Sequence, residues 1–209
     1  MTNYTMFYNP MSRAAIAHWA FPEAGVEFDR VPVDWANKPQ ALLDANPMGK
    51  LPTIIHRHGD HDHVVTEAAA ICHYLAEMEA PDLLPGPHEK AAYFRWLFFA
   101  AGPVESAVTS KAMGWEVSDP QKQGMLGFGN FEKTVDTLDW WLSGHDYVCG
   151  ERFTMADIYV GSEVDWGLMF GTLPERASFT AYAERFRARP AYQAAKASDA
   201  KLMEEMQWK

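Results

Sequence analysis

The sequence predicts an α/β domain with a mixed four-stranded sheet, followed by an all-α domain. Over residues 1–80, short apolar runs bounded by turn residues alternate with helical patterns, which is typical of helices packed on a sheet. After residue 88, apolar residues recur at helical spacing only. Three prolines and a glycine within residues 81–87 mark a linker. We therefore predict a first domain over residues 1–80, a linker over 81–88 and a helical domain over 89–209.

Four short runs, bounded by turn residues or rich in β-branched and aromatic side chains, predict the strands. They cover residues 4–8, 28–33, 53–55 and 64–65. Pro32 places the second strand at an edge of the sheet, because proline cannot donate to the ladder of hydrogen bonds. The last two strands are expected to pair across a loop over residues 56–63.

Apolar residues at helical spacing predict the helices. In the first domain they cover residues 12–24, 39–45 and 67–78. In the second domain they cover residues 89–110, 128–142, 154–169, 178–188 and 191–208. The first of these is either one long helix or two helices joined near Gly102 and Pro103.

Thr154 and Asp157 fit a capping box at the start of one of these helices. The Thr154 hydroxyl can accept a hydrogen bond from the Asp157 amide, and the Asp157 carboxylate can accept one from the Thr154 amide. Phe153 and Ile158 flank the box as a hydrophobic staple. The motif stabilises the fold and carries no chemistry.

The charge balance excludes two classes of partner. The 209 residues include 18 Lys and Arg against 28 Asp and Glu, which gives a formal charge of −10. A surface of this sign repels nucleic-acid phosphates and anionic membranes, so we expect neither as a partner. In addition, no apolar run reaches the ~18 residues that span a bilayer.

Cys72 and Cys149 are the only cysteines, and they form neither a C-x-x-C motif nor a disulfide framework. This usage indicates a reducing compartment. The first ten residues lack the basic and then apolar pattern of a signal peptide. We therefore expect a cytoplasmic protein.

Ser12 lies where the first predicted strand leads into the first predicted helix, within the segment Tyr8-Asn9-Pro10-Met11-Ser12-Arg13. A helix N-terminus exposes backbone N–H groups and the positive end of the helix dipole. A hydroxyl there can donate to an anion such as a thiolate. Serine is also a common N-cap, and this segment alone leaves both roles open.

Pro52 and Glu67 mark two further candidate positions. A cis bond before Pro52 would turn the N–H and C=O of Leu51 outward to pair with an extended peptide, whereas a trans proline would open an edge strand. Glu67 could bind an ammonium group, and the Ala68 amide could bind a carboxylate. Alternatively, Thr66 is an N-cap and Glu67 complements the helix dipole.

Taken together, these segments resemble the glutathione transferase family. The resemblance rests on the hydroxyl after the first strand, the proline before the third strand, the Glu at the start of the third helix and the cap FTMADI over residues 153–158. Residues 95–103 (RWLFFAAGP) are similar to the first helix of the second domain in bacterial members. The resemblance implies a thioredoxin-like first domain, an all-helical second domain, glutathione as co-substrate with no cofactor, and a homodimer.

The resemblance also implies a role for the first candidate segment. Ser12 would be the catalytic hydroxyl that faces the glutathione sulfur. Tyr8, Asn9 and Arg13 would lie beside it at the glutathione site, and Arg13 could add positive potential.

Further implied glutathione contacts come from two later segments. Leu51 would pair with the cysteinyl backbone through its main chain, with Pro52 cis. Glu67 and Ala68 would hold the γ-glutamyl end. The glycyl carboxylate would be within reach of either Lys38 or Lys50.

The implied activity is transfer of the glutathione thiolate to a small apolar electrophile. The thiolate is the nucleophile, and a free thiol has a pKa near ~8.5, so a hydroxyl donor and the helix dipole would favour the reactive form. Two alternatives are a non-catalytic glutathione- or protein-binding member of the same fold, and glutathione-dependent reduction of a peroxide or disulfide.

The sequence departs from the family pattern at two positions. The usual Glu-Ser pair is Glu67-Ala68 here, so one side-chain hydroxyl for the γ-glutamyl carboxylate is missing. Position 12 is Ser rather than Cys, which disfavours a mixed disulfide on the protein.

Residues 56–63 (HRHGDHDH) contain four of the eight histidines. Imidazole and carboxylate are zinc ligands. A Gly-Asp turn between two strands is expected to point alternate side chains apart, so we expect no metal site. His18 and His73 lie in apolar helical segments and are expected to be structural.

Overall fold

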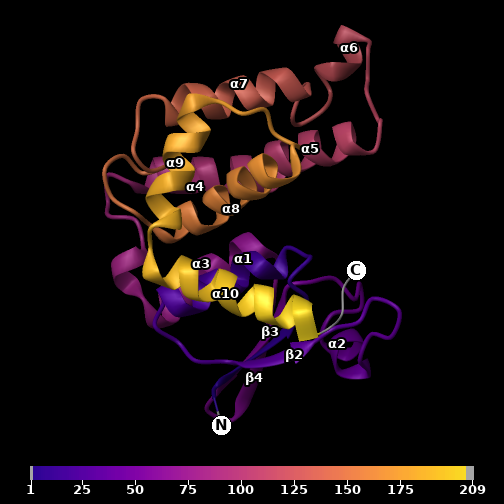
Figure 1. Ribbon diagram of the computed structural model, residues 1–209, viewed down its shortest axis with the longest axis vertical. Coiled ribbons are helices and arrows are strands. Elements are labelled where there is room, and N and C mark those ends of the chain that lie inside the picture. The colour runs from indigo at the N-terminus through magenta and orange to yellow at the C-terminus, as the bar shows by residue number, and fades with distance from the viewer. Residues whose placement is uncertain (1, 206–209) are drawn as a thin grey trace. The chain divides into compact units, whose positions relative to one another are not determined.

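The computed structural model describes residues 2–205, which form two compact units (Figure 1). Within the described residues, unit 1 combines residues 2–84 with 188–205, and unit 2 is Pro85–Arg187. Positions 206–208 of the last predicted helix lie outside the described residues. No helix among residues 2–205 is both long and apolar enough to cross a membrane.

Unit 1 contains a four-stranded mixed sheet in the order β2-β1-β3-β4. Its strands are β1 (Tyr4–Tyr8), β2 (Asp29–Pro32), β3 (Thr53–His58) and β4 (His61–Thr66). β1 pairs with β2 in parallel and with β3 in antiparallel, and β3 and β4 form an antiparallel hairpin. The predicted mixed sheet is confirmed, and β2 lies at the edge that Pro32 predicted.

Helices cover this sheet. Those of unit 1 are α1 (Ala14–Glu23), α2 (Gln40–Ala45), α3 (Ala68–Glu79), the 3-10 turn η1 (Pro81–Leu83) and α10 (Pro190–Glu205). α1 packs against β1, α3 and α10, and Figure 1 shows these three helices together on one side of the sheet. Because β1 is central and covered, four of its five side chains are buried, which explains why its sequence is a nearly continuous apolar run.

The helix α10 belongs to unit 1, whereas we predict from the sequence a single helical domain over residues 89–209. Contacts with α1 hold it there. Arg189 donates two hydrogen bonds of 2.7 Å to the Glu23 carboxylate. Tyr192 packs edge-to-face on Trp19 with ring centroids 5.1 Å apart. The helical pattern of residues 191–208 predicts an apolar face, but the pattern does not say which unit that face covers.

The hairpin of β3 and β4 is longer than predicted. Residues 56–58 and 61–63, expected in a loop, continue the two strands, and the turn consists of Gly59 and Asp60. Gly59 has φ +62°, a conformation that glycine adopts without a steric penalty. The polar side chains of these strand ends are mostly exposed, so they lack the apolar signal that marks a strand.

All the regular secondary-structure elements of unit 2 are helices. Its helices are α4 (Lys90–Phe99), the π-helical segment η2 (Ala100–Val104), α5 (Glu105–Ala112), α6 (Pro120–Gln123), α7 (Phe131–Leu142), α8 (Met155–Phe170) and α9 (Ala177–Arg187). Gly102 and Pro103 lie in the π-helical segment that connects α4 to α5, which agrees with the second of the two alternatives, two helices joined there. Proline lacks the N–H that would continue an α-helix, which accounts for the change from α-helical to π-helical structure at this point. α8 is largely buried and packs against α4 and α9.

The predicted capping box is present at the start of α8. The Thr154 amide donates to Asp157 Oδ2 at 2.8 Å. The same buried carboxylate also accepts hydrogen bonds of 2.8 Å from the Val148 amide and from the Tyr182 hydroxyl on α9. The box therefore joins the loop before α8 to α9 as well as capping α8.

Replacing the capping threonine tests this role. We expect Thr154→Ala to lower the free energy of unfolding by about 1 kcal/mol, because the first turn of α8 loses a cap. Chemical denaturation measures the difference. Thr109→Ala, at an exposed position of α5, is the control and should change stability by less than ~0.5 kcal/mol. Equal effects of the two substitutions would contradict the assignment.

Candidate functional site

The pairing of the strands brings the candidate segments to one end of the sheet. Phe7 lies opposite Thr53, and Thr53 lies opposite Thr66. The carboxyl ends of β1 and β4 and the amino end of β3 therefore share this end, which we call the loop end. β2 runs parallel to β1, so the segment after Pro32 leaves from the loop end too. Four loops with candidate residues meet there: residues 9–13, 33–39, 46–52 and 67–68.

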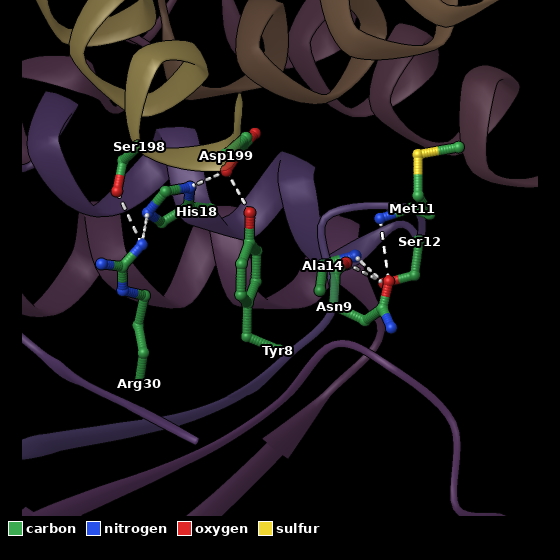
Figure 2. Close-up of polar contacts among 9 residues, drawn as sticks. All are labelled: Tyr8, Asn9, Met11, Ser12, Ala14, His18, Arg30, Ser198 and Asp199. Atoms are coloured by element: carbon green, nitrogen blue, oxygen red, sulfur yellow. Dashed lines mark hydrogen bonds and ion pairs between the residues drawn. The ribbon is translucent and has the colours of Figure 1, made fainter. Parts of the chain in front are cut away.

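Ser12 uses its hydroxyl to organise the loop between β1 and α1. The hydroxyl donates to the Asn9 carbonyl at 2.7 Å, and its oxygen accepts from the Ala14 amide at 3.1 Å (Figure 2). The capping role that the sequence allowed is therefore present. Ser12 as a whole is half-buried rather than fully buried.

Asn9 is a buried residue that shapes this loop from within. Its side-chain amide donates to the Val33 carbonyl at 3.0 Å, and its Oδ1 accepts from the Met11 amide at 2.9 Å. The Asn9 main-chain carbonyl accepts from both the amide and the hydroxyl of Ser12. Asn9 thus ties the β1–α1 loop to the end of β2, and its amide group is directed inward.

Tyr8 and Arg13 differ in exposure. Tyr8 is fully buried, and its hydroxyl donates to the Asp199 carboxylate of α10. Burial, together with this carboxylate, raises the pKa of Tyr8, so its hydroxyl stays protonated. Arg13 is exposed at the start of α1. Among the residues expected beside Ser12, Arg13 is therefore the one whose side chain faces solvent.

The Leu51–Pro52 peptide bond is cis, as the resemblance implied. Leu51 is buried, with 9% of the residue's surface exposed. Among residues 2–205, we find no hydrogen-bond partner for the main-chain N–H or C=O of Leu51. Backbone polar groups are strong hydrogen-bonding groups and are rarely left unpaired, so this donor and acceptor are available to an extended peptide-like ligand.

Asn46 holds the loop that leads into Leu51. Its side-chain amide donates to the Lys50 carbonyl at 3.2 Å and to the Thr53 hydroxyl at 3.0 Å. Gly49 has φ +59°, and a Cβ there would lie 3.3 Å from the Lys38 ammonium nitrogen. Lys38 is thus next to this loop, and Lys50 is exposed beside it. Both predicted cations lie at the loop end.

Glu67 precedes α3 and has an unusual backbone. With φ 65° and ψ 116°, it is the one non-glycine residue with positive φ among residues 2–205. Such a conformation costs about 1–3 kcal/mol, and strained residues of this kind cluster at functional sites. Glu67, not Thr66, occupies the N-cap position, and its side chain makes no capping hydrogen bond. The exposed carboxylate is left at the loop end, next to the Ala68 amide.

The four histidines of the hairpin lie on one face. His56 pairs opposite His63, and His58 pairs opposite His61. The expectation that these side chains point apart is wrong, because opposite and alternate positions of a hairpin share a face. His56 is buried, contacts the Tyr74 hydroxyl at 2.8 Å, and has its pKa lowered by burial and then by His58. In residues 2–205, no group of three or more His, Cys, Asp or Glu is arranged to hold a metal ion.

A thioredoxin-like domain is defined by this sheet, its helices and the cis proline at the loop end. Residues 2–77 match the N-terminal domain of glutathione S-transferases, and residues 103–190 match the C-terminal domain of the same enzymes. The chain belongs to the glutathione S-transferase family.

Individual relatives agree with this assignment. Glutathione S-transferase GstA of Escherichia coli O157:H7 is 25% identical over 196 residues, which cover 90% of this chain and 94% of that protein. The theta class glutathione S-transferase of Xanthomonas axonopodis pv. citri, solved with glutathione bound, is 28% identical. Its TM-score is 0.70, and the match covers 93% of this chain and 97% of that one.

One relative belongs to a different class of protein. The probable elongation factor 1-gamma 1 of Arabidopsis thaliana is 28% identical over 153 residues. The match covers 68% of this chain and 35% of that protein. The fold is therefore also present within a protein that is not named as a transferase.

The backbone of Glu67 leads to a stability prediction. Glu67→Gly and Glu67→Ala both remove the carboxylate, but only glycine tolerates positive φ. We expect the glycine variant to have a free energy of unfolding about 1 kcal/mol higher than that of the alanine variant. Chemical denaturation of the two proteins side by side measures this difference. An alanine variant as stable as the glycine variant would contradict the backbone conformation.

The two cysteines lead to a reactivity prediction. Burial raises the pKa of Cys72 to about 12 and that of Cys149 to about 11. The thiolate is the reactive form, so neither cysteine should be alkylated by iodoacetamide in the folded protein at neutral pH. Mass spectrometry measures the modification, with urea-unfolded protein as the positive control. Rapid alkylation of either native thiol would show that a protein nucleophile is accessible.

Proposed function

We propose that this protein is a glutathione transferase that binds glutathione at the loop end of the sheet and transfers its thiolate to small apolar electrophiles. The observation that carries the proposal is the meeting of three groups at this end. They are the unpaired main chain of Leu51, the exposed Glu67 at the start of α3, and the Ser12 hydroxyl at the start of α1. The glutathione-bound structure of the Xanthomonas relative supports the choice of ligand.

In this proposal, glutathione lies as an extended peptide across the loop end. Its cysteinyl backbone pairs with the N–H and C=O of Leu51, beside Pro52. The γ-glutamyl ammonium binds Glu67, and the γ-glutamyl α-carboxylate binds the Ala68 amide at the positive end of the α3 dipole. This arrangement uses the groups that the fold leaves without internal partners.

Two lysines complete the proposed glutathione contacts. The glycyl carboxylate is bound by Lys38, in the loop after β2, or by Lys50, in the loop before β3; the ammonium group of Lys38 lies beside Gly49, the residue before Lys50. Their positive charge complements the carboxylate. Arg13 adds positive potential near the sulfur from the start of α1.

Ser12 would favour the thiolate of bound glutathione. Lowering the thiol pKa by one unit corresponds to about 1.36 kcal/mol, which one charge-assisted hydrogen bond can supply. The hydroxyl has a single proton, which it now donates to the Asn9 carbonyl. Binding the sulfur therefore requires the hydroxyl to rotate away from Asn9. The thiol proton leaves to solvent, and the sulfur lone pair forms the new bond to the electrophilic carbon. In a substitution the bond to the leaving group breaks and the leaving group departs with its electron pair. In an addition the π-electron pair moves to the electron-withdrawing end of the electrophile, where solvent protonates it.

The proposed function also includes an oligomeric state, a cellular compartment and a biological role. We propose a homodimer in the cytoplasm that conjugates reactive small molecules and so detoxifies them. The family resemblance supports the dimer, and the two unpaired cysteines are compatible with a reducing compartment.

A non-catalytic glutathione-binding protein is the second candidate. Three observations favour it. The Ser12 hydroxyl already donates its proton to the Asn9 carbonyl, and position 68 is Ala, without the hydroxyl of the usual Glu-Ser pair. In addition, one relative is named as a probable elongation factor rather than as a transferase. Glutathione-dependent reduction through a protein mixed disulfide is disfavoured, because burial raises the pKa of both cysteine thiols.

Calorimetry with glutathione, combined with a conjugation assay on a generic aromatic electrophile, separates these candidates. Binding together with turnover supports the transferase. Binding without turnover supports the second candidate. Absence of binding at millimolar glutathione would contradict both.

Replacing the proposed catalytic hydroxyl tests its role. We expect Ser12→Ala to lower kcat about 10–100-fold while the KM for glutathione changes less than about threefold, because the hydroxyl would act mainly on the ionised sulfur. Ser12→Thr keeps a hydroxyl and is the matched control, which should retain most of the activity. Full activity of Ser12→Ala would assign thiolate stabilisation to backbone amides instead.

A further inference from the structure

We propose that Asp199 on α10 is a positioning residue for the loop that carries Ser12. The loop, residues 9–13, lies between Tyr8 and α1, and Asp199 binds a side chain on each side of it. The predicted effect on catalysis rests on the proposed function. The predicted effect on the loop does not.

The contacts involve three buried side chains from three elements. Asp199 Oδ1 accepts a hydrogen bond from the hydroxyl of Tyr8, the last residue of β1. The same oxygen lies 2.5 Å from Nδ1 of His18, on α1 (Figure 2). Tyr8, His18 and Asp199 are only 0%, 4% and 5% exposed. One carboxylate oxygen therefore holds the strand before the loop and the helix after it.

Arg30 contacts this cluster from the side of His18 opposite Asp199. Its Nη1 lies 3.5 Å from His18 Nε2 and donates to the Ser198 hydroxyl at 2.7 Å. A guanidinium has donors only, so Nε2 is the acceptor and we assign the proton to Nδ1, which donates to Asp199. The Asp199 carboxylate and the Arg30 guanidinium thus lie on opposite sides of the imidazole ring. Through Arg30, the cluster also includes β2.

A short chain of contacts leads from the cluster to Ser12. Tyr8 is followed directly by Asn9, whose main-chain carbonyl accepts the hydrogen bonds of both the Ser12 amide and the Ser12 hydroxyl. A shift at the end of β1 therefore moves the carbonyl that holds the Ser12 amide, and with it the backbone that carries the hydroxyl. Displacements of about 1 Å in a catalytic group can cost about 100-fold in rate. Tyr8 and Asp199 are too buried to touch a substrate, so they would act through Ser12.

Docking of α10 does not depend on Asp199 alone. Near the start of the helix, Arg189 binds Glu23 and Tyr192 packs on Trp19. These contacts lie two to three turns before Asp199. Removing the carboxylate should therefore loosen the loop while the first turns of α10 stay bound to α1. A loosened loop beside a bound helix would therefore distinguish a role in positioning the loop from a general role in holding α10.

Two substitutions of Asp199 distinguish the effect of losing the hydrogen-bonding oxygen from the effect of losing the negative charge. Both hydrogen bonds go to Oδ1, an oxygen that Asp199→Asn retains, whereas Asp199→Ala removes it. We expect Asp199→Ala to speed amide hydrogen exchange about tenfold or more at Met11, Ser12 and Ala14, as measured by NMR. Asp199→Asn should stay within about threefold of the wild type. Glu204→Gln, an exposed position on the same helix, is the control and should change nothing.

Kinetics adds a second readout. In a protein that conjugates glutathione, Asp199→Ala should lower kcat about tenfold or more with the KM for glutathione changed less than about threefold, and Asp199→Asn should restore most of kcat. If Asp199→Ala does not fold, Tyr8→Phe replaces it. This variant removes one of the two bonds and should speed exchange at the same amides about threefold.

The outcomes are distinguishable from those of the proposed function. Unchanged loop exchange in Asp199→Ala, or in Tyr8→Phe where that variant stands in, would overturn the positioning role. Equal acceleration at the Gln193 amide, which belongs to the first turn of α10, would also overturn it, because the helix would then have undocked. Faster loop exchange in a protein that binds no glutathione would uphold positioning and reject the proposed function.

Discussion

Pairing between β1, β3 and β4 is the constraint on which the candidate site depends. Because Phe7, Thr53 and Thr66 are consecutive partners across the sheet, the loops that follow β1 and β4 and the loop that precedes β3 must meet at one end. A shift in register by one residue would move every side chain of a strand to the other face. The ladder of hydrogen bonds thus sets the position of residues that are more than fifty positions apart in sequence.

Polar side chains around the loop end serve mainly to hold its loops. Asn9 and Asn46 each use a side-chain amide to satisfy backbone carbonyls of neighbouring segments. A buried polar group such as Asn9 is stabilising when it is paired and costly when it is not. The loops are therefore held by bonds to one another. Within residues 2–205, the main chain of Leu51 makes no hydrogen bond and the side chain of Glu67 makes no capping hydrogen bond. Asp199 extends the same arrangement to the last helix of the chain.

The sequence predicted those features that depend on local patterns. The bounds of β1 match exactly because its apolar run ends at Asn9-Pro10, and the capping box of α8 is set by residues three positions apart. The cis bond before Pro52 followed from the family resemblance, since base rates favour trans. The convergence of the candidate segments was predictable once the strand order was known.

Features that depend on distant contacts were not predictable. Tyr8 has an aromatic side chain next to Ser12, and nothing local shows that its hydroxyl is bound by a residue 191 positions later. The helical pattern of α10 does not reveal that it covers unit 1. The exposed histidines of β3 and β4 lack the apolar alternation of a half-buried strand, so the hairpin was predicted too short.

A crystal structure of the protein with glutathione would show whether the tripeptide lies at the loop end. We expect electron density for an extended tripeptide whose cysteinyl backbone pairs with the main chain of Leu51. The γ-glutamyl end should lie at the start of α3, and the sulfur should lie within hydrogen-bonding distance of the Ser12 hydroxyl. Glutathione bound elsewhere on the protein, or with its sulfur remote from the start of α1, would contradict the account.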